Sequence, residues 1–360
     1  MSYHIVNAKI VNEGTVIMGD LSVARGRILG VNVPPPRGAE VVDAAGAYLL
    51  PGMIDDQVHF REPGLAHKAT IATESRAAVA GGVTSYLEMP NCDPQTVTAS
   101  ALEDKHARAA ARSMANYGFY LGATNDNLDA IKAVDRRLAC GIKIFMGSST
   151  GNMLVDDERT LEGIFAASPL VIATHCEHTP TIVANEAAAR ARYGDNIPFT
   201  EHPHIRSADA CYRSSSLAVE PATRYDARLH VLHITTAREL SLFEPGDLAD
   251  KRITSEACVH HLFFNDTSYP AKGADIKCNT RCSRCSSMCA PARSASRRWS
   301  KRPRTHRRDC SASQNAGSSG RAIGPIWCWS IPPRRRATAP SFPSVGGARS
   351  ATSCSRREYA

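Results

Sequence analysis

The alternation of apolar and polar positions over residues 1–50 predicts short strands. Three segments show it, at residues 4–11, 15–23 and 27–31. Turn sequences separate the three segments at Asn12-Glu13-Gly14 and at Arg25-Gly26, and Pro51-Gly52 then interrupts the pattern. We therefore expect a small β domain at residues 1–50.

From Met53 onward, apolar runs alternate with longer segments of helical periodicity. The apolar runs cover residues 53–60, 83–89, 117–122, 141–146, 170–174, 228–234 and 253–259. The helical segments cover residues 71–80, 101–115, 127–137, 157–167, 181–193 and 208–225. Repeated strand–helix alternation predicts a parallel sheet. Seven runs approach the eight strands of a (β/α)8 barrel, and a doubly wound sheet is the alternative.

The composition changes after residue 280. Residues 281–360 contain 17 Lys and Arg, two acidic residues, no Leu and all three Trp of the chain. Without aliphatic residues at regular spacing, such a segment has little apolar surface to bury against the loss of chain entropy. We therefore expect residues 280–360 to be an aberrant, disordered tail, and a change of reading frame is the interpretation that we favour.

Two other interpretations of this tail compete with a change of frame. Its net charge of +15, against −7 for residues 1–280, suits a nucleic-acid-binding arm. Cys282, Cys285 and Cys289 suit a small zinc module, although no second pair of cysteines follows at finger spacing. Neither interpretation explains why the change falls inside the motif described below, so we expect no nucleic-acid partner.

The chain shows no signal for a membrane or for export. No apolar stretch approaches the roughly 20 residues that a membrane-spanning helix needs. The first residues, from Met1 to Val11, lack the basic segment and apolar run of a secretory signal. We expect a cytoplasmic protein with no membrane partner.

Polar side chains of types that bind metals and carboxylates stand at the ends of the apolar runs. They are His59 and Arg61 after the first run, Asn91 after the second, Lys143 in the fourth, His175 in the fifth and His233 in the sixth. In a barrel these strand ends converge on one rim, where a histidine cluster suits zinc. Each residue also has a structural interpretation: a histidine hydrogen-bonded at a half-buried strand end, or Lys143 as a buried ion-pair partner.

Three strings resemble those of dihydroorotases in the amidohydrolase superfamily. They are His59-Phe60-Arg61-Glu62-Pro63-Gly64, Met89-Pro90-Asn91 and Lys277-Cys278-Asn279, and the resemblance covers residues 1–279 in order. It implies a metal-dependent (β/α)8 TIM-type barrel at residues 51–279, incomplete at its C-terminal end, joined to a small β-sandwich-like domain.

The resemblance also implies a site. His59, Lys143, His175 and His233 would hold one or two Zn2+ ions, with Lys143 carboxylated, and Gln57 stands where the family has a better histidine ligand. Arg61, Asn91 and Asn279 would hold the carboxylate of the substrate and its polar neighbours, because an arginine presents a planar fork to a carboxylate. The implied reaction interconverts N-carbamoyl-L-aspartate and L-dihydroorotate in pyrimidine biosynthesis.

The chain departs from the family after Asn279. The proton-transferring Asp, in an Asp-His-Ala-Pro-His-like motif, has no counterpart there, so we identify no catalytic residue and expect the activity of this chain as written to be impaired. Two alternatives stay open: another cyclic amidohydrolase, such as a dihydropyrimidinase or allantoinase, and a non-catalytic relative that assists a pathway partner. Arg61 argues against the first, since those substrates lack the carboxylate. A homodimer and association with aspartate transcarbamoylase are the partnerships considered.

Overall fold

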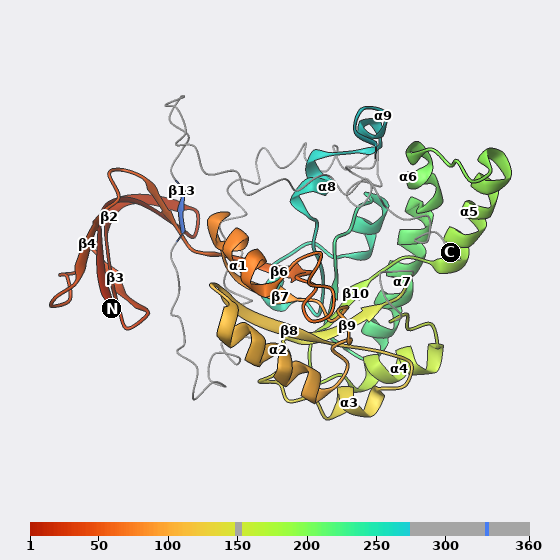
Figure 1. Cartoon of the computed structure of the whole chain (residues 1–360), viewed down its shortest axis with the longest axis horizontal. Coiled ribbons are helices and arrows are strands. Elements are labelled where there is room, and N and C mark those ends of the chain that lie inside the picture. Colours follow the sequence, from red (N-terminus) through yellow and green to blue (C-terminus); the bar gives the residue numbers. More distant parts are fainter. Residues whose placement is uncertain (148–152, 274–327, 331–360) are drawn as a thin grey trace.

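Two β-sheets organise the chain (Figure 1). The computed structural model describes residues 1–147, 153–273 and 328–330. The smaller sheet lies at one end of the molecule with the N-terminus, and the helices gather around the larger sheet. Asn279, Cys282, Cys285 and Cys289 lie outside the described residues, as does all of the predicted tail except residues 328–330.

The smaller sheet contains the strands predicted for residues 1–50. Its strands are β1 (Ser2–Asn12), β2 (Thr15–Ala24), β3 (Arg27–Val31), β4 (Glu40–Asp43), β5 (Tyr48–Leu50) and β13 (Cys328–Ser330). β1 pairs with β2, β4 and β5, and β13 pairs antiparallel with β5. Residues 328–330, within the predicted tail, thus form an edge strand of this sheet, and the disorder expected for the tail stays a prediction.

Two tight turns set the register of this sheet. Glu13 and Gly14 have positive φ angles of 47° and 81°, and Arg25 and Gly26 have 50° and 71°. Two consecutive residues with positive φ are typical of a type I′ turn, whose twist matches that of the flanking strands. The predicted turn sequences thus lie at the two hairpins that join β1 to β2 and β2 to β3.

The larger sheet is an incomplete barrel of parallel strands. Its strands are β6 (Met53–Val58), β7 (Val83–Glu88), β8 (Asn116–Gly122), β9 (Gly141–Phe145), β10 (Ile172–His175), β11 (Leu229–Val231) and β12 (Ile253–Ser255). Each strand pairs in parallel with the strand that precedes it, in the order β12-β11-β10-β9-β8-β7-β6. A doubly wound sheet would reverse its strand order at one point. The predicted barrel is confirmed, with β6 and β12 as the two edges of the described sheet.

Helices follow the strands and pack on the outside of the barrel. They are α1 (Ile71–Ala80), α2 (Ala99–Arg112), α3 (Leu128–Lys132), α4 (Glu158–Ala167), α5 (Thr179–Tyr193), α6 (His202–Ile205), α7 (Ala208–Arg224), α8 (Val259–Phe263) and α9 (Tyr269–Lys272). Short 3-10 turns lie at Phe199–Glu201, Arg238–Leu242, Leu248–Asp250 and Asp266–Ser268. Side chains of Thr70, Thr98, Asp157 and Ser207 accept a backbone N–H at the start of α1, α2, α4 and α7, which fixes where these helices begin.

Two apolar clusters fill the barrel. The larger one, between strands and helices, includes Ile71, Leu102, Phe119, Ile142 and Ile164, all fully buried. A smaller one contains Leu87, Met89, Tyr120, Ala173 and Leu232. These clusters pack the strands against one another and against the helices, and so determine where the carboxyl ends of the strands lie.

Candidate metal centre

The side chains predicted to bind metal come together at the carboxyl ends of the barrel strands. His59 follows β6, Lys143 lies in β9, His175 ends β10 and His233 lies just after β11. Burial lowers the pKa of His59 to about 3, with a further contribution from the charge of Arg61. Lys143 and His175 add to the same lowering of this pKa, so these side chains lie within electrostatic range of one another.

His233 belongs to the same group. Burial, followed by the charges of His175 and Lys143, holds the pKa of His233 well below its usual value. His233 also has a φ of 40°, in the left-handed region that residues other than glycine rarely adopt. Such backbone strain is more common at functional sites than elsewhere. Neutral imidazoles are the form that binds metals, and both His59 and His233 are held in that form near neutral pH.

Lys143 is buried without an ion pair. It is 1% exposed, and its Nζ has no hydrogen-bond partner among the described residues. The ring of Phe145 lies beside it, with its centroid 4.5 Å from Nζ. Burial lowers the pKa of Lys143 to about 7. The alternative interpretation of Lys143 as a buried ion-pair partner is therefore wrong for the described part of the chain, and a substantial share of its amine is neutral at neutral pH.

Gln57 has a second buried polar atom without a hydrogen-bond partner among the described residues. Its Oε1 is buried and, within the described residues, accepts no hydrogen bond. Burying a polar atom without a partner costs free energy. Gln57 Oε1 and Lys143 Nζ therefore fit a group that would bind at this rim, such as a cation for the oxygen and carbon dioxide for the amine.

The orientation of the His59 ring is set by Asn91. His59 Nδ1 lies 2.8 Å from Asn91 Oδ1. Because an amide oxygen only accepts, His59 Nδ1 carries the hydrogen and donates it, which leaves Nε2 with a lone pair. Asn91 was predicted to bind substrate; in the structure it positions a predicted metal ligand, and its contact with a substrate stays a prediction.

His175 links His233 to a buried carboxylate. His175 Nδ1 lies 3.1 Å from His233 Nε2, and His175 Nε2 lies 3.1 Å from Glu177 Oε2. Glu177 is fully buried and forms an ion pair with Arg206. The carboxylate favours a hydrogen on His175 Nε2, so the lone pair of Nδ1 faces His233. Carboxylates orient metal-binding histidines in this way in many metalloproteins.

A β-bulge brings a second set of charged groups to the centre. Asp55 pairs with Tyr86 and Val58 with Glu88, so β6 has one residue more than β7 between these pairs. Asp56, at this bulge, has a carboxylate oxygen 3.8 Å from His230 Nε2.

Glu256, after β12, completes this set. Its carboxylate lies 3.7 Å from His230 Nε2, and His230 Nδ1 lies 2.8 Å from Thr254 Oγ1. Burial opposes protonation of His230, but the carboxylates of Glu256 and Asp56 outweigh it and raise the pKa of His230. Asp56, His230 and Glu256 could hold a cation, since their ligand atoms lie within 4.8 Å of one another. The attraction between the protonated imidazole and the two carboxylates already accounts for their proximity.

Sequence reasoning gave no role to Glu177, Arg206, Asp56, His230 or Glu256. Asp56 and Glu177 stand within three residues of His59 and His175, and this short spacing is a signal that could have found them. Arg206 and Glu256 lie on other segments, with no motif to mark them.

Arg61 and Asn91 lie on two loops that touch each other. Arg61 Nη1 donates to the backbone oxygen of Asn91 at 3.2 Å. Gly64 has a φ of 79°, and a Cβ there would lie 1.9 Å from the backbone oxygen of Asp93. Only glycine allows this approach, which explains why the string that carries Arg61 ends in Pro63-Gly64. The third residue predicted to bind substrate, Asn279, lies outside the described residues.

Among the helices described, none combines the length and apolar character needed to cross a membrane.

Comparison with known proteins identifies similar sequences and similar folds. A family model described as dihydro-orotase-like matches residues 46–133. An allantoinase of Bacillus velezensis is 32% identical over 288 residues, which cover 77% of this chain and 63% of that protein. A dihydroorotase of Halobacterium salinarum is 33% identical over 261 residues, which cover 69% of this chain and 59% of that protein.

Solved structures agree on the fold. The L-hydantoinase (dihydropyrimidinase) of Arthrobacter aurescens superimposes with a TM-score of 0.68 at 22% identity, covering 75% of this chain and 61% of that chain. A dihydropyrimidinase of Brevibacillus agri gives a TM-score of 0.65 at 23% identity, covering 77% and 61%. The chain thus spans less than two thirds of the length of each of these relatives.

Proposed function

From its place in the amidohydrolase superfamily, among relatives that hydrolyse cyclic amides, we propose that this chain is of the dihydroorotase type. The reaction would interconvert N-carbamoyl-L-aspartate and L-dihydroorotate in de novo pyrimidine synthesis. The observation that carries the proposal is the convergence of His59, Lys143, His175 and His233 at one rim of the barrel. We place this reaction in the cytoplasm.

One or two zinc ions fit the residues of the centre. His59 Nε2 and Gln57 Oε1 would be ligands, as would His175 Nδ1 and His233 Nε2, which lie 3.1 Å apart. Carboxylated Lys143 would add ligands to the same centre, since a carbamate offers two oxygens where an amine offers one nitrogen. Such a centre supplies Lewis acidity, which activates water for attack on an amide carbonyl.

The residues of this chain that select the substrate are Arg61 and Asn91, with Asn279. Dihydroorotate and carbamoyl-aspartate carry carboxylates, and a guanidinium binds a carboxylate through two parallel hydrogen bonds. Arg61 is held by the backbone oxygen of Asn91, beside His59, so a substrate carboxylate at Arg61 would place the ring amide close to the centre.

A second candidate is a hydrolase of allantoin or a hydantoin. The observation in its favour is that allantoinases match this chain as well as the dihydroorotase does, at 32% against 33% identity. Purified, zinc-loaded protein assayed with dihydroorotate, allantoin and hydantoin separates the two. Turnover of allantoin or hydantoin alone would reject the dihydroorotase proposal. An Arg61→Met variant should weaken binding of dihydroorotate and leave the uncharged substrates unaffected.

The chain lacks the proton-transferring Asp that the family has after the position of Asn279, and this absence affects the expected turnover. We propose that the chain as written binds zinc and substrate but turns over slowly, because no group after Asn279 matches the proton-transferring Asp of the family. Sequencing the gene across the codons of residues 277–282 tests the change of frame that we favour, and an unchanged frame would reject it. If the chain binds zinc without turnover, the remaining proposal is a non-catalytic role, either beside aspartate transcarbamoylase or within a homodimer. Co-purification with aspartate transcarbamoylase tests the first arrangement, and sedimentation of the chain alone tests the second.

A further inference from the structure

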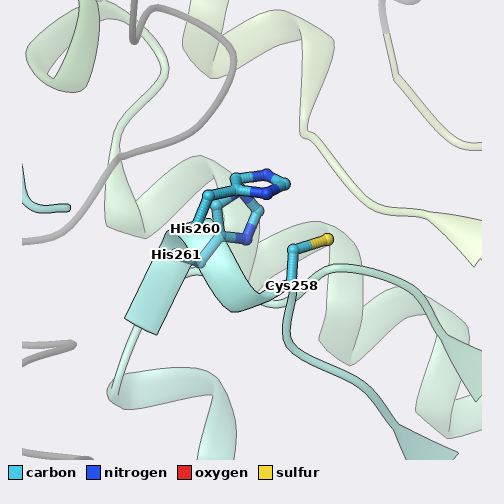
Figure 2. Close-up of side chains that lie close together, drawn as sticks. All are labelled: Cys258, His260 and His261. Carbon is cyan, nitrogen blue, oxygen red and sulfur yellow. The ribbon is translucent and has the colours of Figure 1, made fainter. Parts of the chain in front are cut away.

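Cys258, His260 and His261 form a group of metal-binding side chains that the barrel centre does not use (Figure 2). The sulfur of Cys258 and one ring nitrogen of each histidine all lie within 4.8 Å of one another. With bonds of about 2.0–2.3 Å, the donors around a tetrahedral zinc ion are separated by roughly 3–4 Å. Small rotations of the side chains would therefore bring these three donors onto one ion.

The local chain geometry gathers the three donors on a four-residue stretch. Cys258 is the residue that precedes α8, with an extended backbone (φ −70°, ψ 148°), and its side chain makes no capping hydrogen bond. Figure 2 shows the rings of His260 and His261 close together at the start of α8, with the Cys258 sulfur on the same side. The ring centroids are 4.5 Å apart. Closing so short a stretch around an ion costs little chain entropy.

The surroundings of the group favour a cation. Cys258 and His260 are half-buried, so an ion can reach them, whereas His261 is buried. Burial raises the pKa of the Cys258 thiol to about 12, and the nearby carboxylates of Glu256 and Asp55 add to this rise. The same carboxylates provide negative charge that attracts a positive ion.

We propose that Cys258, His260 and His261 bind one zinc or similar transition-metal ion at a site distinct from the barrel centre. A thiolate and two imidazoles are the donors that zinc prefers, and magnesium and calcium prefer oxygen. On binding, the thiol loses its proton to solvent and the sulfur becomes a ligand. Three protein donors leave one position for water or an external ligand.

This site borders the barrel centre without sharing a ligand with it. The charge of His261 contributes to lowering the pKa of His233, so the two histidines are neighbours. The predicted ligands of the barrel centre include no thiolate, whereas the new site has one. This difference makes the two sites distinguishable by spectroscopy.

Cobalt titration of the full chain tests the proposal. Cobalt replaces zinc in nitrogen and sulfur sites, and a thiolate ligand gives a sulfur-to-cobalt charge-transfer band. The chain has 12 cysteines, so each variant is compared with the parent chain rather than with zero. Cys258→Ser and His260→Ala should each bind one cobalt ion fewer per chain, and Cys258→Ser should lose part of the charge-transfer band.

Two further variants serve as controls. Cys140→Ser removes another half-buried thiol that forms no disulfide, and this variant should bind as much cobalt as the parent. His175→Ala should lose cobalt from the barrel centre but keep the charge-transfer band, so failure of the proposed function and failure of this inference give different results. A folded Cys258→Ser or His260→Ala chain with unchanged stoichiometry overturns the proposal. If Cys258→Ser does not fold, His260→Ala decides, because its ring is less buried.

Discussion

His59 Nδ1 donates a hydrogen bond to Asn91 Oδ1 at 2.8 Å, between loops that follow two neighbouring strands of the barrel. This contact directs the lone pair of His59 Nε2 toward the predicted metal position. We expect Asn91→Leu to lower zinc affinity about 10- to 100-fold, the range typical when the partner of a metal-binding histidine is lost. Competition with a chromophoric chelator measures the change.

A matched control for this variant is Asn116→Leu. Asn116 lies at the start of β8, at the opposite end of the barrel, where its side chain donates to Ser85. Zinc affinity should be unchanged in Asn116→Leu. Equal losses in the two variants would mean that Asn91 acts on stability rather than on the orientation of His59.

Lys143→Met should stabilise the metal-free protein in a pH-dependent way. Burial lowers the pKa of Lys143 to about 7 from 10.5, so below pH 7 the folded chain bears a buried, unpaired charge. Between these pH values the unfolded chain binds the extra proton, so the stability of the parent rises with pH across this range. The gain from Lys143→Met should be greatest below pH 7 and vanish near pH 10.5. Urea unfolding in a chelator, at several pH values, measures it.

The same variant tests carboxylation. The neutral amine reacts with carbon dioxide, so the parent chain incubated with zinc and 13C-bicarbonate should show a carbamate signal in its NMR spectrum. Lys143→Met should show none. A parent chain without that signal, but with bound zinc, would contradict the carboxylated lysine.

Hydrophobic periodicity predicted all seven barrel strands, but it did not distinguish the barrel from a doubly wound sheet. That choice depends on which strands are neighbours, and this information lies in long-range packing. The helix predicted at residues 127–137 ends at Lys132. Here the carboxylate of Asp135 accepts the backbone N–H of Arg137, and this local turn competes with helical hydrogen bonds.

The residues of the candidate site were predicted only in part, because some of their contacts also depend on long-range packing. His59 follows β6 and Lys143 lies within β9, so their positions follow once the barrel is recognised. Glu177 and Arg206 could not be paired from sequence, because their contact joins residues 29 positions apart. The contact between Asn91 and His59 likewise depends on how two loops meet.

Arg206→Met should destabilise the protein by about 3 kcal/mol. Glu177 is buried and would keep its charge after Arg206, its ion-pair partner, is removed, and breaking a buried pair typically costs about 3–5 kcal/mol. Arg206 is 28% exposed, so the lower end of this range applies. Replacing both residues, as Glu177→Gln with Arg206→Met, should recover part of the loss because no buried carboxylate charge remains.

Urea unfolding compares these variants with Arg190→Met. Arg190 forms an exposed ion pair with Glu186 one helical turn away, and such pairs contribute about 0.3–0.5 kcal/mol. An Arg206→Met variant that loses no more stability than Arg190→Met would show that the carboxylate of Glu177 finds water or a proton instead.

Gly147→Ala should disturb the metal centre through the backbone of Glu177. A Cβ at Gly147 would lie 2.1 Å from the backbone oxygen of Glu177, too close for any contact. The segment that carries His175 and Glu177 must then shift, so we expect a loss of about 1–3 kcal/mol in stability, as for other overpacked sites, together with weaker zinc binding. Gly81→Ala is the control, because its nearest atoms lie 3.5 Å away at the end of α1. Calorimetry with and without zinc separates the loss of stability from the loss of zinc binding. A Gly147→Ala chain is expected to melt at a lower temperature without zinc in either case. If zinc then raises its melting temperature as much as it raises that of the parent, the shift does not reach His175.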